Sequence, residues 1–343
     1  MFKPLILALL CTLPTPIMAQ AETLPGFDHI MVDAPHRPRV MEAAVWYPAG
    51  SQSYSVPLGA NPVFTGTRVS FAPKLAEGRY PLIILSHGSG GNINGMGWLA
   101  GPLAIKGAIV VGVNHPGTTS GDSSARRTVQ VTERARDIPA VIDAVLAHPD
   151  FGPAIDPEQI TVLGFSLGGA TALHVAGAQM KREAYGAYCD RFPTASDCEF
   201  LGRGGVNLHD LPAEWEATDM REPRIKTMIS VDPGFGYAMT EASLATITAR
   251  TLIVNLGDDE TQWAATDAGP NGSNLLAHIP GAKLERLAPA WHFSFLGTCT
   301  DMGAELLRED KDDPVCDEPA GGDRAILHGK AIATISEFLG LKG

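Results

Sequence analysis

Short continuous apolar runs recur along the chain, each bounded by glycine, proline or polar residues. Pro81–Ser86 reads PLIILS, and Ile160–Phe165 reads ITVLGF. Runs of this length without alternation are typical of strands covered on both faces, as in a parallel sheet. The same pattern predicts two early strands within residues 24–48, the clearer being Met41–Tyr47, and later strands at Ala108–Val113, Lys226–Val231, Thr251–Asn255 and Ala282–Leu287.

Helical periodicity alternates with these runs. In Val129–Leu146, the apolar residues Ile138, Val141 and Val145 fall on one helical face. Further helices are predicted at Gly169–Met180 and Ala325–Leu339. Because strands and helices alternate, we expect an α/β protein with a mostly parallel central sheet and helices on both faces.

Residues 181–223 interrupt this alternation with a polar, charged and glycine-containing stretch. We expect a small insertion after the helix that follows Ile160–Phe165, lying over the carboxyl-terminal edge of the sheet, where α/β proteins bind ligands. It would act as a lid, with Trp215 and Phe200 as candidate substrate contacts. A surface decoration is the alternative. No composition break separates another domain, so residues 22–343 are interpreted as a single domain.

The first twenty-one residues have the pattern of a signal peptide. Lys3 supplies the positive start, Leu5–Leu13 the apolar run, and Ala19-Gln20-Ala21 the small-residue cleavage site. The apolar run is too short to cross a bilayer, and Leu10 precedes Cys11 where a lipoprotein signal has a small residue. We therefore expect a periplasmic or secreted protein without a stable membrane anchor. A buried N-terminal helix is the alternative.

Four cysteines remain after such a signal is removed. An even number in an exported chain predicts disulfides, and the sequence-local pairs Cys189–Cys198 and Cys299–Cys316 are favoured. The rival explanation is a metal site, but no CxxC pair or histidine pattern supports it, so we expect no metal.

The charge balance narrows the partners. The 343 residues include 26 Lys and Arg against 38 Asp and Glu, a formal net charge of -12. A broad nucleic-acid surface needs clustered basic residues, so this class of partner is excluded.

The clearest chemical motif is Gly164-Phe165-Ser166-Leu167-Gly168, a GxSxG between a predicted strand and a predicted helix. This is the context of a nucleophile elbow, and it makes Ser166 the candidate nucleophile. The turn is so tight that side chains at Gly164 and Gly168 would collide with neighbouring backbone.

A second motif, Ser86-His87-Gly88-Ser89-Gly90-Gly91, directly follows the PLIILS strand. Acyl transfer develops an oxyanion that needs preorganised N–H donors. We expect these from the backbone of Leu167, after the nucleophile, and of Ser89, in this loop. A plain glycine-rich turn is the alternative. His87 is interpreted as a structural hydrogen-bonding residue.

A serine nucleophile needs a base, and His292 follows the last predicted strand, where this kind of site places it. His174 and His278 compete poorly, and His115 is a candidate pocket residue. Two strand ends offer the acid. Asp232 ends one strand before Pro233-Gly234, and Asp258, Asp259 and Glu260 follow the next. Asp232 is preferred because it ends an apolar strand and the Pro-Gly turn would aim its carboxylate; Glu260 is the alternative acid.

Together these motifs resemble the dienelactone-hydrolase-like group of α/β-hydrolases, and within it the platelet-activating factor acetylhydrolase type. The resemblance covers about residues 40–339. It implies the α/β-hydrolase fold and a Ser-Asp-His esterase without metal or other cofactor. In the acetylhydrolase type the acid position matches Asp232, whereas in most other relatives it matches Glu260. Some related secreted enzymes cleave polyesters, which the resemblance leaves open for this chain.

The expected function is therefore carboxylic ester hydrolysis through an acyl-enzyme, on a small-molecule or polymer ester. An acyltransferase, thioesterase or peptidase would use the same residues. A non-catalytic binding protein that kept the fold is the rival from another class.

Overall fold

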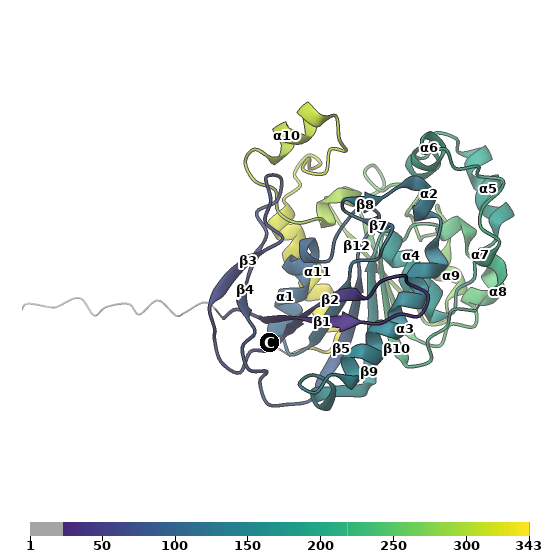
Figure 1. Cartoon of the computed structure of the whole chain (residues 1–343). Helices are drawn as coiled ribbons and strands as arrows, with labels where there is room; N and C mark the ends of the chain where they lie inside the picture. Colours follow the sequence, from purple (N-terminus) through teal and green to yellow (C-terminus); the bar gives the residue numbers. More distant parts are fainter. Residues whose placement is uncertain (1–22, 218, 343) are drawn as a thin grey trace, which may run out of the picture.

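The computed structural model describes residues 23–217 and 219–342, so the predicted signal peptide lies outside the described residues. A ten-stranded sheet runs through the molecule in the order β12-β11-β10-β9-β5-β6-β2-β1-β4-β3 (Figure 1). Its strands are β1 Gly26–Val32, β2 Met41–Tyr47, β3 Ser55–Leu58, β4 Thr67–Phe71, β5 Tyr80–Ser86, β6 Ile109–Val113, β9 Ile155–Phe165, β10 Ile225–Val231, β11 Arg250–Leu256 and β12 Lys283–Leu287.

Most of this sheet is parallel. Strands β6, β5, β9, β10, β11 and β12 pair in parallel, while β2 pairs antiparallel with β6 and with β1. Strand β5 lies between β6 and β9. After β5 the chain adds β6 on one side, and it then crosses to add β9, β10, β11 and β12 on the other side. The carboxyl ends of strands at such a switch point border a crevice where α/β proteins bind ligands.

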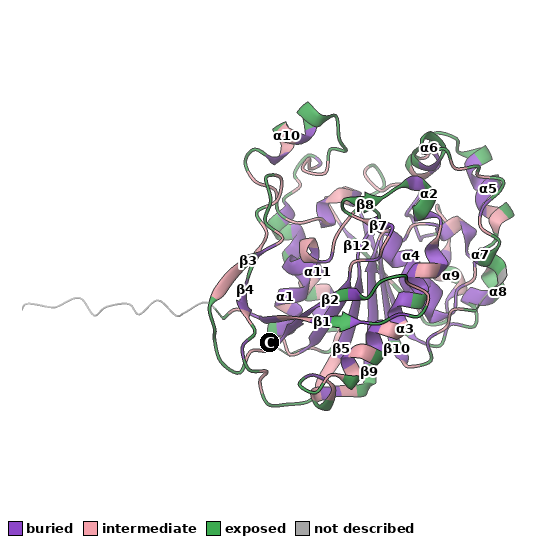
Figure 2. Cartoon of the chain, viewed as in Figure 1, coloured by how far each residue is buried: buried purple, intermediate pink, exposed green. Residues whose placement is uncertain are grey.

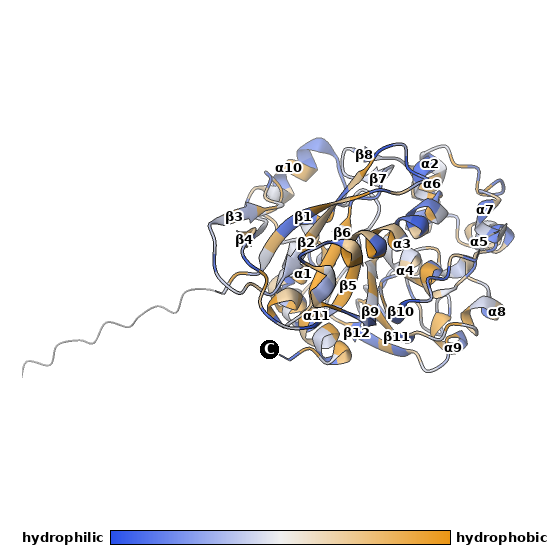
Figure 3. Cartoon of the chain, turned by 60° about the horizontal axis from the view of Figure 1, so that its bottom comes forward, coloured by the Kyte–Doolittle hydropathy of each residue, from blue (hydrophilic) through white to orange (hydrophobic). Residues whose placement is uncertain are grey.

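Two hydrophobic cores lie on opposite faces of the sheet. Leu82 and Ile84 of β5 belong to one core and Ile83 and Leu85 to the other, as the period of two in a strand requires. Helices α3 (Val131–Ala147) and α4 (Leu167–Ala176) contribute to the first core, and α1 (Gly97–Ile105) and α11 (Arg324–Leu339) to the second. Figure 2 shows the central strands buried, and Figure 3 shows their apolar character. The predicted α/β class is thus confirmed.

Several elements were not predicted. The polar and proline-rich stretch before Tyr80 contains β3 and β4, and α1 and α10 (Gly303–Asp310) also lack a sequence prediction. Only two residue pairs join β4 to β1, Gly26 with Ser70 and Phe27 with Phe71, and β3 lies beyond β4 at the edge of the sheet. Short strands at this side of the sheet need few apolar residues, so their sequence pattern is weak.

Residues 181–223 form helices α5 (Arg182–Arg191), α6 (Ser196–Arg203) and α7 (Glu214–Ala217). The Tyr185 and Tyr188 hydroxyls, on α5, donate to the carboxylate of Asp197 at the start of α6, at 2.7 and 3.1 Å. The Cys189–Cys198 disulfide joins the same two helices. These links hold α5 against α6.

Candidate active site

Ser166 lies at the turn between β9 and α4 with backbone angles φ 56° and ψ -117°. A residue with a Cβ rarely adopts positive φ, and such strain is typical of a nucleophile elbow. A Cβ at Gly164 would overlap the backbone of Gly168, and one at Gly168 would overlap the backbone of Ser86. The structure therefore leaves no room for a side chain at either position, as expected from the sequence.

The structure brings Ser166, His292 and Asp232 together. His292 Nε2 lies 3.0 Å from Ser166 Oγ, and His292 Nδ1 lies 2.8 Å from Asp232 Oδ2. An ionised carboxylate only accepts hydrogen bonds, so Nδ1–H donates to Asp232. The other ring nitrogen is then free to accept the proton of the Ser166 hydroxyl.

Asp232 is completely buried and strongly held. Its Oδ1 accepts hydrogen bonds from the Leu256 N–H at 2.8 Å and the Asn255 side-chain amide at 3.2 Å. Its own backbone has φ 44°, which turns the chain sharply at the end of β10. These donors and this turn aim the second carboxylate oxygen at His292.

The alternative acids are placed differently. Asp258, Asp259 and Glu260 are all exposed, and the Asp258 carboxylate accepts from the backbone N–H groups of Glu260 and Thr261. Within the described residues, no hydrogen bond connects Glu260 with His292. The structure therefore brings Asp232, and not Glu260, to the histidine.

The His292 ring is held between two aromatic side chains. It stacks on Phe165, with ring centroids 4.7 Å apart, and on Trp263, with centroids 4.6 Å apart. His292 begins a short 3-10 helix, His292–Phe295, directly after the loop that follows β12. Both stacked faces fix the plane of the imidazole, so its two nitrogens stay in line with Ser166 and Asp232.

Ser166 and His292 open into a cavity of about 1090 Å³. Its wall mixes aromatic residues, such as Trp263 and Trp291, with polar and charged ones, and the insertion contributes Tyr185, Phe200 and Leu201. Pro314, after α10, also lines the cavity, and Figure 1 shows α6 and α10 at the same end of the molecule. Trp215, which was expected to contact substrate, does not line the cavity. It is buried against Tyr185 and Phe235 and donates from Nε1 to the Val129 carbonyl at 2.7 Å.

The two expected oxyanion donors, Ser89 and Leu167, both line this cavity. Leu167 is the first residue of α4, where a backbone N–H has no partner within the helix. The Ser89 hydroxyl is hydrogen-bonded to the Thr128 hydroxyl at 2.8 Å. The residue after the nucleophile and the loop after β5 thus reach the same cavity as Ser166.

Sequence reasoning missed a buried polar network behind that loop. His115 is fully buried and does not line the cavity, contrary to expectation. Its Nδ1 donates to Asp137 Oδ2 at 2.7 Å, and its Nε2 lies 2.9 Å from Ser86 Oγ. Arg134, one turn before Asp137 on α3, also reaches Ser86. The signal in the sequence was the presence of two charged residues, Arg134 and Asp137, beside the apolar helix positions Ile138, Val141 and Val145.

The remaining expectations concern cysteines, metals and membranes. Both predicted disulfides, Cys189–Cys198 and Cys299–Cys316, are formed, which indicates an oxidising compartment.

Among residues 23–217 and 219–342, no group of three or more His, Cys, Asp or Glu side chains is arranged to hold a metal ion. No helix in that part of the chain has the length and hydropathy of a membrane span.

No family model matches the chain, and no curated protein matches its sequence. Solved structures do resemble it. A ferulic acid esterase from Streptomyces cinnamoneus has a TM-score of 0.55 at 17% identity, over 94% of this chain and 91% of that one. A dienelactone hydrolase-like promiscuous phosphotriesterase from metagenomic libraries has a TM-score of 0.49 at 14% identity, over 92% and 99%. A dienelactone hydrolase from Anabaena variabilis has a TM-score of 0.47 at 12% identity, over 92% and 96%.

At these identities the likeness concerns the fold. The esterase match spans nearly all of both chains, and this chain itself has a mostly parallel sheet with helices on both faces. The fold expected from the sequence motifs is thereby confirmed: the chain has the α/β-hydrolase fold.

Proposed function

We propose that this protein is a serine esterase of the dienelactone-hydrolase-like group that cleaves carboxylic esters through an acyl-enzyme. The observation that carries the proposal is the hydrogen-bonded series Ser166–His292–Asp232, with distances of 3.0 and 2.8 Å, whose serine and histidine line a cavity. This is the geometry by which a serine hydroxyl is activated.

In the proposed mechanism, His292 Nε2 takes the proton as Ser166 Oγ attacks the ester carbonyl. Backbone N–H groups of Leu167 and Ser89 stabilise the resulting oxyanion, and the Asp232 carboxylate stabilises the imidazolium. His292 then returns the proton to the departing alkoxide, leaving an acyl group on Ser166. Water, deprotonated by His292, releases the acid and restores the serine.

The cavity supports an organic ester as substrate. A volume of about 1090 Å³ accommodates a ligand of drug-like size. The lining mixes aromatic side chains with polar ones, which suits an ester that has both apolar and polar parts. The oxidising compartment indicated by the disulfides supports action outside the cytoplasm, in the periplasm or after secretion, on a small-molecule or polymeric ester.

The test combines labelling with turnover. A fluorophosphonate should attach to Ser166 in the wild-type protein, located by peptide mass spectrometry, and p-nitrophenyl esters from acetyl upward should be hydrolysed. Ser166→Ala should lose labelling and at least about 10³-fold in kcat while unfolding at the wild-type temperature, because only one hydroxyl is removed. A wild-type protein that neither labels nor hydrolyses any ester would favour a non-catalytic binding protein.

A further inference from the structure

Arg134 is a buried arginine, 1% exposed, and it has no ion-pair partner within residues 23–217 and 219–342. The hydrogen bonds that it makes in this part of the chain all go to neutral oxygen atoms. The neighbouring carboxylate of Asp137 forms its ion pair with Arg37 and is hydrogen-bonded to His36 and His115. Burial lowers the pKa of Arg134 to about 9, so the guanidinium is still charged at neutral pH. The charge of Asp137 acts on Arg134 without a direct contact and raises its pKa. The guanidinium itself donates only to neutral oxygens, so no direct ion pair offsets the cost of burying its charge.

One side of the guanidinium holds the loop after β5. Arg134 Nη2 donates to the His87 carbonyl and, at 3.1 Å, to Ser86 Oγ. Nη1 donates to Thr118 Oγ1 at 2.6 Å, and the Thr118 carbonyl accepts the N–H of Gly90 at 2.9 Å. The guanidinium is therefore connected to the loop on both sides of Ser89.

The other side holds the helix that begins after Ser166. Arg134 Nε donates to Thr171 Oγ1 at 3.1 Å, and that hydroxyl donates to the Leu167 carbonyl at 3.0 Å. One planar group thus touches both segments that carry the proposed oxyanion donors. Because a guanidinium presents its donors in a rigid fork, its contacts set the spacing of the groups it joins.

We propose that Arg134 is a positioning residue that clamps the loop of Ser89 to the first turn of α4, and so sets the distance between the two N–H groups that receive the oxyanion. The inference rests on the proposed esterase function. Its positive charge, desolvated beside the carbonyls of this site, also favours the negative charge that develops there.

The clamp should act on the transition state rather than on substrate binding. Arg134→Lys keeps the charge but loses the fork, because an ammonium cannot span both segments. We expect kcat to fall about 10- to 100-fold with KM changed less than about threefold. A trifluoromethyl ketone, which forms an anionic adduct with the nucleophilic serine, should lose affinity by the same factor as kcat/KM.

A paired substitution at Thr171 tests the same link without touching the arginine. Thr171→Val is close in shape but lacks the hydroxyl that joins Arg134 to Leu167, and it should lower kcat about three- to tenfold. Thr171→Ser keeps the hydroxyl and should recover most of that loss. This pair decides the matter if Arg134→Lys does not fold.

The matched control is Arg221→Lys. Arg221 donates to the carbonyl of Ala176, the last residue of α4, at 3.2 Å and to that of Thr246 at 2.9 Å, and it lies 3.9 Å from Asp219. These contacts are at the end of α4 far from Ser166. The Arg221→Lys variant should keep wild-type kcat per active site, counted by fluorophosphonate titration.

Wild-type kcat and ketone affinity in folded Arg134→Lys, or equal kcat in the two Thr171 variants, would overturn the clamp inference and leave the proposed esterase function standing. A wild-type protein without esterase activity would overturn it together with the proposed function.

Discussion

Asp232 and Glu260 follow neighbouring strands, and only Asp232 meets His292. The carboxylate of Asp232 is buried, hydrogen-bonded to the backbone of Leu256 and 2.8 Å from His292 Nδ1. Glu260 is exposed. A buried carboxylate that fixes the histidine tautomer contributes to the transition state far more than a solvated one does.

We therefore predict that Asp232→Asn lowers kcat by roughly 10²- to 10⁴-fold with little change in KM, because the amide no longer favours the Nδ1–H tautomer of His292. Steady-state kinetics on one p-nitrophenyl ester checks this. Glu260→Gln is the matched control and should keep kcat within about twofold. The reverse pattern, with Glu260→Gln inactive, would assign the acid to the later strand.

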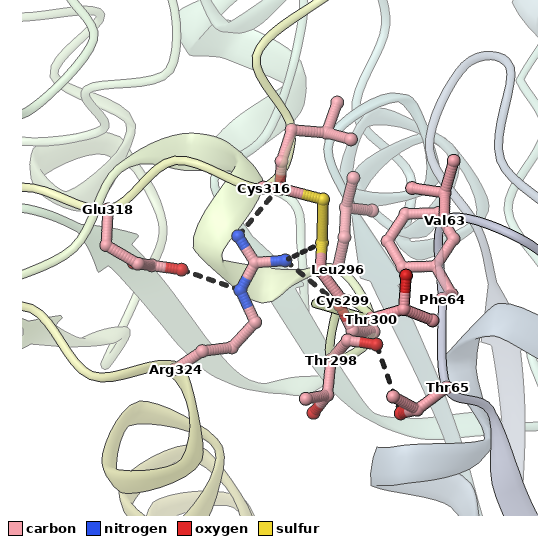
Figure 4. The surroundings of a disulfide bond; sticks show 12 residues. Val63, Phe64, Thr65, Leu296, Thr298, Cys299, Thr300, Cys316, Glu318 and Arg324 are labelled. Atoms are coloured by element: carbon pink, nitrogen blue, oxygen red, sulfur yellow. Dashed lines mark hydrogen bonds and ion pairs between the residues drawn. A yellow bond between two sulfur atoms is a disulfide. The ribbon is translucent and has the colours of Figure 1, made fainter. Parts of the chain in front are cut away.

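At the scale of elements, hydrogen bonds connect the segment after His292 to Glu318 and to the start of α11. The Ser294 hydroxyl donates to Glu318 at 2.5 Å, and Arg324 donates to Glu318 at 2.6 Å and to the Gly297 carbonyl at 2.9 Å. Figure 4 shows the Cys299–Cys316 disulfide beside this arginine. The short helix of His292 is thus anchored to α11 and to the disulfide.

Replacing Cys299 and Cys316 by serine should destabilise the protein by about 2–3 kcal/mol, because the unfolded chain loses a constraint. It should also lower kcat severalfold, since His292 loses part of its anchor. Replacing Cys189 and Cys198, on α5 and α6, should cost similar stability but alter KM instead. Thermal unfolding and kinetics of both double variants check this. Unchanged kcat without the Cys299–Cys316 link would contradict the anchoring role.

The helices of residues 181–223 are proposed to act as a lid that selects the acyl group. Phe200 on α6 is 47% exposed and lines the cavity, whereas Phe192, after α5, is 39% exposed and is not among the lining residues. Phe200→Ala should lower kcat/KM for long acyl chains by about fivefold, an apolar contact of roughly 1 kcal/mol, and leave acetyl esters unaffected. Phe192→Ala is the control. Equal chain-length profiles for wild type and Phe200→Ala would show that the segment does not select the substrate.

For the molecule as a whole, buried neutral histidines predict acid lability. Burial lowers the pKa of His115, His174 and His328 to about 4. An unfolded histidine titrates near 6.5, so the unfolded state binds more protons below that pH. Stability is therefore complete above about pH 6.5 and is lost as the pH falls towards 4. One such histidine costs about 2 kcal/mol at pH 5.

His174 tests this cleanly. It is fully buried in α4, neither ring nitrogen has a hydrogen-bond partner among the described residues, and only Asp219 acts to raise its pKa. His174→Leu should show a smaller drop in melting temperature between pH 8 and pH 5 than the wild type. His209→Leu, at an exposed side chain, should follow the wild type. Parallel curves for His174→Leu and wild type would contradict the prediction.

Local pattern alone predicted the α/β class, the parallel strands β5, β6, β9, β10, β11 and β12, and the turn of Ser166. These follow from residue types that act on their own neighbours: apolar runs that must be buried on both faces, and glycines that a tight turn requires at Gly164 and Gly168.

The tertiary structure decided what depends on contacts between distant segments. Asp232 and Glu260 both follow strands, and the choice between them came from the donors of Leu256 and the position of His292. The role of Arg134 depends on three segments that meet only in the folded chain. The helices of 181–223 are joined by a disulfide and by the hydrogen bonds of two buried tyrosines to Asp197. The hydrogen-bond partners of a buried polar group, and the distant side chains that it contacts, are properties of the assembled sheet, and no local pattern in the chain specifies them.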